Sequence, residues 1–247
     1  MNVAPSIPES LTAIHVAVII PAINEQESIG QVIAAVPSWV KQIIVADNGS
    51  TDNTVVVAQK AGATVVPARI RGYGSACLAG IAAAGNADVL VFMDGDFSDY
   101  PEQMGLLVQP IAENRAELVI GSRTLGHRER GSLTLQQRFG GALACKLMRL
   151  LWHAHYTDLG PFRAISRAAL EQLQMDDRNF GWTVQMQIRA AAAGLRTMEV
   201  PVDYRCRIGK SKISGTVRGV VMAGYKILYT IGKEFFAARR YAEKSGI

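Results

Sequence analysis

The first 122 residues alternate short apolar runs with segments of helical pattern, and this alternation constrains the fold more than any other feature. Apolar runs cover residues 15–21, 42–47, 64–68, 88–94 and 117–122, and helical patterns fall near 26–36, 52–61, 74–84 and 101–113. Strands that are apolar along both sides have to be covered on both faces, as in parallel sheets flanked by helices. The order therefore predicts an α/β fold with a Rossmann-like, mostly parallel sheet and helices on both faces.

The remainder of the chain has a looser pattern. A polar loop at 123–135 precedes helical stretches near 136–152 and 181–193 and a strand at 197–205. We expect a disordered lead-in over residues 1–13, one domain over 14–215, and a basic amphipathic helix over 216–247. The lead-in lacks the basic start and apolar centre of a signal peptide, and no apolar run is long enough to predict a membrane-spanning helix.

Composition agrees with this organisation. A chain of 247 residues with 49% hydrophobic and 19% charged residues suits one large α/β domain, or at most two small ones. Cys77, Cys145 and Cys206 are far apart in the sequence, form no metal-binding spacing and indicate a reducing compartment. The four histidines likewise form no zinc or catalytic-triad arrangement.

Polar side chains follow three of the predicted strands at their carboxyl ends. These are Asn24 and Glu25 after the first strand, Asp47 at the end of the second, and Asp94 and Asp96, separated by Gly95, at the end of the fourth. The carboxyl ends of parallel strands meet at one edge of a sheet, where ligands bind. Clustered carboxylates repel one another unless a cation or hydrogen-bond donors are bound, and oxygen ligands suit Mg²⁺ or Mn²⁺. The sequence thus predicts a divalent metal on Asp94 and Asp96.

The same segments also suit simpler structural roles, and the motifs of other phosphate-binding proteins are missing or incomplete. The DGD segment is also typical of a tight turn with a helix cap at Ser98 or Asp99, and Ser50 or Asp52 suits a cap for the helix after the second strand. No GxxxxGK[ST] motif is present, and RGYGSACLAG (71–80) holds only an incomplete glycine fingerprint away from the first strand. A P-loop NTPase and a dinucleotide oxidoreductase are therefore not expected.

Three motifs along the predicted strands, PAINE (21–25), ADNGSTDNT (46–54) and DGD (94–96), resemble the family 2 glycosyltransferases of the GT-A fold. Three more are similar to those of the polyprenyl-phosphate sugar synthases, the dolichyl-phosphate mannose synthase group: GSR (121–123), DLGPFRAI (158–165) and RIGKSKISGTVRG (207–219). The resemblance covers roughly residues 14 to 220. It implies a GT-A fold and a nucleotide-sugar donor.

The resemblance also implies a role for each matching residue. Pro21, Ile23, Glu25, Val45 and Asp47 would hold the nucleoside, Asp94 and Asp96 the metal on the diphosphate, and Met93, Gly95, Arg123, Arg207 and Lys212 would complete the donor site. Arg123 and Arg138 would receive the acceptor phosphate, and Asp158 would lie near the reacting sugar. Arg207 and Lys212 are spaced more closely than in the mannose synthases, so Arg205 is an alternative to Arg207.

A phosphorylated acceptor also has a physical argument in its favour. Transfer to a hydroxyl normally needs a general base, whereas a phosphate monoester, with a second pKa of about 6, is already an anionic nucleophile. Its reaction needs arginines that position two anions and a metal that stabilises the leaving diphosphate. Asp158 stays open as a base, as an orienting group, or as a structural partner of Arg163 or a backbone amide.

We therefore expect inverting transfer of a hexose from a GDP-mannose or UDP-glucose type donor to a polyprenyl or dolichyl phosphate, assisted by Mg²⁺ or Mn²⁺. A soluble phosphorylated or hydroxyl acceptor is the alternative, because it would keep every donor motif. A sugar nucleotidyltransferase would need a glycine-rich signature after the first strand, which PAINE does not supply. A nucleotide-sugar sensor without activity would have no use for DGD.

The end of the chain is strongly basic. From residue 205 onward ten Lys and Arg residues face two acids, Glu234 and Glu243. Apolar residues recur at helical spacing at Val217, Val220, Val221, Tyr225, Leu228, Tyr229, Ile231, Phe235 and Phe236, with Lys226, Lys233, Arg239 and Arg240 as charges. This face suits either packing on the domain or an anionic membrane surface. We expect a peripheral protein at the cytoplasmic face of a membrane, with no nucleic-acid partner.

Overall fold

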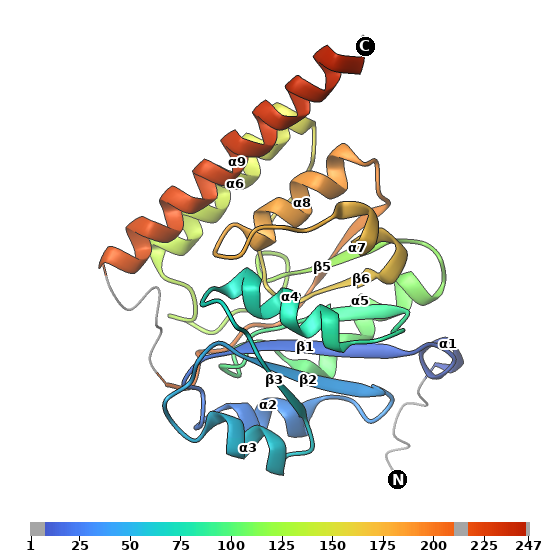
Figure 1. Cartoon of the computed structure of the whole chain (residues 1–247), viewed down its shortest axis with the longest axis vertical. Coiled ribbons are helices and arrows are strands. Elements are labelled where there is room, and N and C mark those ends of the chain that lie inside the picture. The colour runs from blue at the N-terminus through green and yellow to red at the C-terminus, as the bar shows by residue number, and fades with distance from the viewer. Residues whose placement is uncertain (1–7, 210–216, 246–247) are drawn as a thin grey trace.

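The computed structural model describes residues 8–209 and 217–245, and a seven-stranded sheet with the order β3-β2-β1-β4-β6-β5-β7 lies at its centre (Figure 1). The strands are β1 (Val16–Ala22), β2 (Gln42–Asp47), β3 (Thr64–Pro67), β4 (Val89–Phe92), β5 (Leu118–Ser122), β6 (Arg163–Ser166) and β7 (Thr197–Pro201). Neighbouring strands pair in parallel except where β6 pairs antiparallel with β4 and β5. The predicted mostly parallel α/β sheet is confirmed.

Helices cover both faces of this sheet (Figure 1). They are α1 (Glu9–Thr12), α2 (Ile29–Ala35), α3 (Thr54–Lys60), α4 (Tyr73–Ala83), α5 (Met104–Ala112), α6 (Leu135–Trp152), α7 (Arg167–Leu173), α8 (Trp182–Ala192) and α9 (Val217–Ser245), with a 3₁₀ turn, η1 (Pro101–Gln103), before α5. Two predicted strands are shorter than expected, because β4 ends at Phe92 and β7 at Pro201. The residues that were predicted to extend these strands instead form loops at the carboxyl edge of the sheet.

Alternate side chains of β1 pack into two separate cores, one on each face of the sheet, as expected for a strand that is buried on both sides. Val18 and Ile20 pack in the cluster that includes apolar residues of α2 and α5, whereas Ala17 and Ile19 pack in the cluster that includes α4 and α8. All four side chains are fully buried. The near-continuous apolar sequence of this strand is therefore explained by its position in the middle of the sheet.

The sequence pattern did not predict β6 or the short helix α7 that follows it. Strand β6 begins with Arg163, whose side chain is fully buried, so the segment has no apolar run. The Arg163 guanidinium donates to two carbonyl oxygens, those of Gly160 and Thr183. A central strand is thus built around a buried cation that the backbone solvates.

The expected disordered lead-in is too long at its carboxyl end. Residues 9–12 form α1, and Leu11 is buried in the same core as β1 and α5. One apolar side chain among polar neighbours was too weak a signal for this contact. Residues 1–7 lie outside the described part of the chain.

A third cluster joins α6, α8 and α9 beside the sheet. Met148 of α6, Ile188 of α8 and Ile231 of α9 are buried together, and α6 and α9 lie side by side (Figure 1). Helix α6 begins with a capping box in which Thr134 and Gln137 exchange side-chain and backbone hydrogen bonds. Within the described residues, no helix is long and apolar enough to cross a bilayer.

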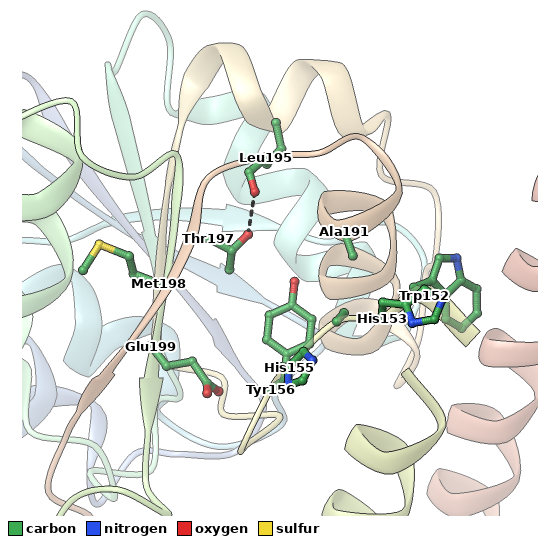
Figure 2. Close-up of a pocket in the computed structure, with 10 residues that line it drawn as sticks. Trp152, His153, His155, Tyr156, Ala191, Leu195, Thr197, Met198 and Glu199 are labelled. Atoms are coloured by element: carbon green, nitrogen blue, oxygen red, sulfur yellow. Dashed lines mark hydrogen bonds between the residues drawn. The ribbon is translucent and has the colours of Figure 1, made fainter. Parts of the chain in front are cut away.

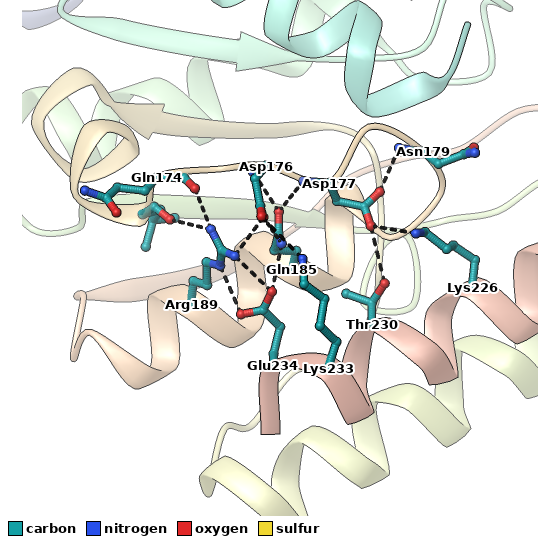
Figure 3. A network of polar contacts seen from close by, with 11 residues as sticks. Gln174, Asp176, Asp177, Asn179, Gln185, Arg189, Lys226, Thr230, Lys233 and Glu234 are labelled. Atoms are coloured by element: carbon teal, nitrogen blue, oxygen red, sulfur yellow. Dashed lines mark hydrogen bonds and ion pairs between the residues drawn. The ribbon is translucent and has the colours of Figure 1, made fainter. Parts of the chain in front are cut away.

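Polar contacts also fasten α9 to the domain, on the loop between α7 and α8 (Figure 3). Lys226 pairs with Asp177 at 3.4 Å, and Lys233 pairs with Asp176 at 3.3 Å. Glu234 of α9 is buried and forms an ion pair of 3.0 Å with Arg189 of α8. Of the two roles that the sequence left open for this face, the ion pairs of Lys226 and Lys233 favour packing on the domain at these two positions.

Candidate functional site

The loops after β1 and β2 are locked to each other at the carboxyl edge of the sheet. Asn24, which has a positive φ of 53°, accepts a hydrogen bond from the Thr51 amide at 2.7 Å through its side chain. Its own amide donates to the Ser50 hydroxyl at 2.9 Å, so Ser50 does not cap the following helix. Asp52 lies one residue before the N-cap residue Asn53 and accepts from the amide of Thr54, the first residue of α3, at 2.9 Å.

The residues predicted to hold the nucleoside differ in their exposure. Asp47 lies half-buried at the end of β2, and its carboxylate accepts from the amides of Gly49 and Ser50 at 3.2 and 3.1 Å. Pro21, near the end of β1, and Ile23, in the loop that follows, are both partly exposed. Val45 and Met93 are fully buried in the core, so the structure places these two side chains beneath the edge and not on its surface.

Arg207 joins two of the predicted acidic residues. Its guanidinium lies 2.9 Å from Glu25 and 3.0 Å from Asp96, measured between nitrogen and carboxylate oxygen. The segment carrying Arg207 returns to the fourth strand end, where the Ile208 amide donates to the Asp96 carbonyl oxygen at 3.0 Å. The structure thus brings together Glu25, Asp96 and Arg207, which are far apart in the sequence.

Arg205 has a different task and does not replace Arg207. Its guanidinium stacks over the rings of Phe97 and Tyr100, at 3.5 and 4.0 Å from their centroids. It also donates to the carbonyl oxygens of Phe97 and Asp99, at 2.7 and 3.0 Å. Arg205 therefore supports the loop that follows Asp96.

Negative charge accumulates around Asp94. Burial and the neighbouring charge of Asp96 raise the pKa of Asp94 to about 7. Asp99, which sequence analysis treated only as a cap, is fully buried, and burial followed by the charge of Asp94 raises its pKa well above the ordinary value. One Asp99 oxygen accepts from the Asp94 amide at 3.3 Å, and the other has no hydrogen-bond partner among the described residues.

A divalent cation fits this arrangement. Carboxylate oxygens without enough compensating positive charge are the ligands that Mg²⁺ and Mn²⁺ prefer. No group of three or more His, Cys, Asp or Glu in the described ranges forms a complete ligand set, so water and phosphate oxygens would supply the rest. The residues of this chain that would hold the cation are Asp94 and Asp96.

Arg123 and Asp158 meet at the end of β5. The Arg123 guanidinium donates two hydrogen bonds to the Asp158 carboxylate, at 2.7 and 2.8 Å, and the Arg123 amide adds a third at 2.9 Å. A fourth comes from the Leu159 amide at 2.7 Å. Burial acts to raise the pKa of Asp158, but Arg123 outweighs burial and holds this pKa below its ordinary value. Asp158 is bonded to Arg123 and backbone amides, and does not hold Arg163.

The two remaining predicted cations are not drawn into this cluster. Arg138 lies in the first turn of α6 with an exposed side chain, and within the described ranges that side chain contacts neither Arg123 nor Asp158. Lys212 lies outside the described residues. The structure therefore brings Arg123 and Asp158 together, and Asp96 and Arg207 together, and leaves Arg138 outside both contacts.

Two pockets accompany these residues. One of about 270 Å³ is lined by Glu25, Glu27, Asp52 and their neighbours Asn24, Gln26, Ile208 and Gly209. A larger one of about 370 Å³ lies among the end of α6, α8 and β7, where Figure 2 shows Trp152, Tyr156 and Glu199. None of the residues predicted from the sequence lines the larger pocket. Glu199 still touches the site indirectly, because its carboxylate accepts from the Asp158 amide at 3.3 Å.

Comparison with known proteins adds independent findings. The family described as glycosyl transferase family 2 matches residues 17–174. An uncharacterized glycosyltransferase of Mycobacterium tuberculosis is 37% identical over 211 residues, which cover 84% of this chain and 94% of the relative. The undecaprenyl-phosphate mannosyltransferase of Micrococcus luteus is 30% identical over 222 residues, covering 83% of this chain and 90% of the relative.

Solved structures show the same fold. The glucosyl-3-phosphoglycerate synthase of Mycobacterium tuberculosis, in complex with Mn²⁺, UDP and glucosyl-3-phosphoglycerate, superposes with a TM-score of 0.76. Its sequence is 22% identical, and the match covers 95% of this chain and 86% of that chain. This likeness establishes the architecture of the sheet and its helices.

Proposed function

Because the chain belongs to glycosyl transferase family 2, we propose that this glycosyltransferase moves a hexose, with inversion, from a nucleotide-sugar to a phosphorylated acceptor. The acceptor we favour is a polyprenyl phosphate, presented at the cytoplasmic face of a membrane. The donor is of the GDP-mannose or UDP-glucose type.

The observation that carries this proposal is the ion pair of Asp158 with Arg123. A carboxylate that accepts four hydrogen bonds and has a lowered pKa is a poor general base. A hydroxyl acceptor needs such a base, whereas a phosphate monoester is already anionic at neutral pH. Asp158 would instead orient Arg123, whose remaining N–H groups would face the acceptor phosphate, with Arg138 as a second cation for that phosphate.

The donor would bind where Glu25, Asp96 and Arg207 meet. Arg207 would move from these carboxylates to the diphosphate, with Lys212 as a second cation, while Glu25 and Asp47 contact the nucleoside. A Mg²⁺ or Mn²⁺ ion on Asp94 and Asp96 would supply positive charge to the departing diphosphate. The structural neighbour crystallised with Mn²⁺ and UDP supports this part of the proposal.

The reaction is then a single displacement at the anomeric carbon. An oxygen of the acceptor phosphate forms a bond to this carbon as the bond to the β-phosphate oxygen breaks, and the nucleoside diphosphate leaves with the electron pair. Arg123 would hold the attacking phosphate and Arg207 the leaving diphosphate, which keeps two anions in reacting distance. No proton has to be removed from the nucleophile.

Exposed apolar side chains on α6 and α9 support a lipid-borne acceptor. Nine large ones gather there: Leu135, Phe139, Leu143 and Leu150 on α6, and Met222, Tyr225, Leu228, Tyr229 and Phe236 on α9. The two helices lie side by side, so these residues would form one surface against lipid (Figure 1). Arg138 and Lys146, exposed on α6, would meet anionic headgroups. The related undecaprenyl-phosphate mannosyltransferase is consistent with this choice.

A soluble phosphorylated acceptor is the second candidate, favoured by the neighbour that was crystallised with phosphoglyceric acid. Both candidates are tested by incubating the protein and Mn²⁺ with radiolabelled GDP-mannose or UDP-glucose, and either polyprenyl phosphate in vesicles or 3-phosphoglycerate in solution. We expect radiolabel in the lipid phase. Label in the aqueous product alone would favour the second candidate, and release of free hexose alone would contradict both.

A further inference from the structure

The glycine-rich segment RGYGSA (71–76) opens α4 beside the site, and the donor scheme above gives it no role. Its central residue, Tyr73, donates a hydrogen bond from its hydroxyl to a carboxylate oxygen of Asp94, at 3.2 Å. A phenol keeps its proton at neutral pH and is a natural donor to a carboxylate. Tyr73 thus contacts Asp94 without belonging to any of the sequence motifs assigned to the donor site.

The backbone around Tyr73 is held closely by a distant segment. The Ser75 amide and hydroxyl both donate to the Arg178 carbonyl oxygen, at 3.1 and 3.2 Å. A Cβ added to Gly72 would lie 2.0 Å from the Arg178 carbonyl oxygen, and one added to Gly74 would lie 2.0 Å from that of Asp177. Both glycines are therefore required by close backbone packing.

A second strand end fixes the same turn from the other side. Asn48, which follows β2, accepts a hydrogen bond from the Gly72 amide at 3.0 Å. Gly72 itself has a φ of 149°, a value that side chains disfavour. The backbone that carries the Tyr73 side chain is therefore held on both sides by hydrogen bonds. This restricts the position of the hydroxyl and keeps it next to Asp94.

The loop that packs on these glycines is itself clamped by α9. Asp177 is the partner of Lys226, and its carboxylate also accepts from the Thr230 hydroxyl at 3.5 Å (Figure 3). On the same loop Gly181 leaves no space, because an added Cβ would lie 2.2 Å from the Thr230 hydroxyl oxygen. Contacts thus run without interruption from α9 through the loop to the start of α4.

We propose that Tyr73 is a positioning residue that fixes the Asp94 carboxylate for the metal of the donor site. The proposal rests on the proposed function, since it assumes a cation on Asp94 and Asp96. Tyr73 acts through Asp94 and does not contact the reacting atoms. Hydrogen-bond partners of metal ligands restrict the ligand's orientation, and their loss typically weakens metal binding by 10-fold or more.

The test is Mn²⁺ binding to the full chain, measured by electron paramagnetic resonance with and without UDP, for wild type and Tyr73→Phe. We expect Tyr73→Phe to weaken Mn²⁺ binding about tenfold while the melting temperature changes little. The matched control is Tyr156→Phe, which also removes one phenolic hydrogen bond, to the Gln187 carbonyl oxygen at 3.1 Å. It should leave the Mn²⁺ affinity unchanged.

A double-mutant cycle with Asp94→Asn separates positioning from a general structural effect. If Tyr73 works through Asp94, adding Tyr73→Phe to Asp94→Asn should weaken Mn²⁺ binding no further. An equal additional loss in both backgrounds would overturn the inference, as would wild-type affinity in Tyr73→Phe. Wild type that binds no Mn²⁺ even with UDP would overturn the proposed donor site as well, so the two failures are distinguishable.

Discussion

The Asp158 carboxylate accepts two hydrogen bonds from the Arg123 guanidinium, at 2.7 and 2.8 Å, and both side chains are largely buried. The pair makes each residue depend on the other. Without Asp158 the buried guanidinium would lose the carboxylate that it is hydrogen-bonded to, and without Arg123 the buried carboxylate would lose its cation. This dependence decides which variants can report on catalysis and which report first on stability.

Asp158→Asn should therefore lower the free energy of unfolding by about 3 to 5 kcal/mol, the usual cost of breaking a buried ion pair from one side. Urea unfolding followed by circular dichroism measures this change. Glu113→Gln, which breaks an exposed pair with Arg115, is the matched control and should change little. An equally small effect of Asp158→Asn would contradict the structural role that we assign to the pair.

Mn²⁺ affinity should rise with pH through neutrality. The pKa of Asp94 is raised to about 7 by burial and by Asp96, so below that value the proton competes with the metal for this carboxylate. Lowering the pH from 8 to 6 should weaken Mn²⁺ binding by about tenfold. Below the pKa of a ligand that takes up one proton, the apparent metal affinity falls about tenfold per pH unit. Titrations at constant ionic strength provide the measurement, and an affinity independent of pH would rule out Asp94 as the titrating ligand.

Asp96→Ala should abolish transfer and leave the fold intact. Asp96 lies at the strand edge, where its carboxylate is bound by Arg207 and by the Ser98 amide at 3.0 Å, and it supports no apolar core. Steady-state assays with saturating Mn²⁺ test the loss, and circular dichroism tests the fold. Comparable kcat/KM values for this variant and wild type would end the metal assignment.

Arg138 offers a cleaner test of acceptor binding than Arg123, because its side chain is exposed and is not part of a buried ion pair within the described residues. Arg138→Ala should raise KM for the phosphorylated acceptor about tenfold, as expected when a charged hydrogen bond of roughly 1.5 kcal/mol is lost. Donor affinity by calorimetry should stay the same. Arg149→Ala, also exposed on α6, serves as the control. Weaker donor binding in Arg138→Ala would move this arginine to the donor side.

The membrane surface is best tested by substitution and not by truncation. Cutting after Gly232 would remove Glu234 and break its ion pair with Arg189, so a truncated chain would lose stability as well as apolar surface. The double variant Leu135→Ser, Phe139→Ser should reduce co-sedimentation with vesicles containing anionic lipid, since both side chains are about three-quarters exposed, at 76% and 74%.

Leu106→Ser supplies the comparison for that experiment. Leu106 is also an exposed apolar residue, but it lies on α5, away from the α6 and α9 surface. Its substitution should leave sedimentation unchanged. If wild type itself stays in the supernatant at low salt, the lipid-borne acceptor is wrong and the soluble acceptor becomes the better proposal.

The parallel strands and their acidic ends could be predicted because each is encoded by consecutive residues, an apolar run followed by a carboxylate. Strand β6 could not, since Arg163 takes the place of an apolar residue, and the carbonyl groups that accept its hydrogen bonds are brought to it by the fold. Asp99 and Tyr73 were missed for a related reason, because their importance comes from burial and from contact with Asp94.

The sequence predicted that the C-terminal segment is an amphipathic helix, but not which of its apolar residues are buried. Its period predicted one apolar face, and the structure divides that face: Ile231 is buried, whereas Tyr225 and Leu228 are exposed. In the sequence, Lys226 and Lys233 are typical of a helix that binds an anionic surface. In the structure they form ion pairs with Asp177 and Asp176, which lie on a different segment. A pattern within one helix does not show which charges another segment will neutralise.

The bridge made by Arg207 between Glu25 and Asp96 has a thermodynamic consequence for the order of binding. A bare cation that approaches Asp96 has to displace Arg207, and a bare diphosphate meets the carboxylates around Asp94. When both arrive together, the cation takes the carboxylates and the diphosphate takes Arg207, so every charge exchanges one partner for another. Metal and nucleotide should therefore bind with positive cooperativity, each increasing the affinity for the other by the same factor.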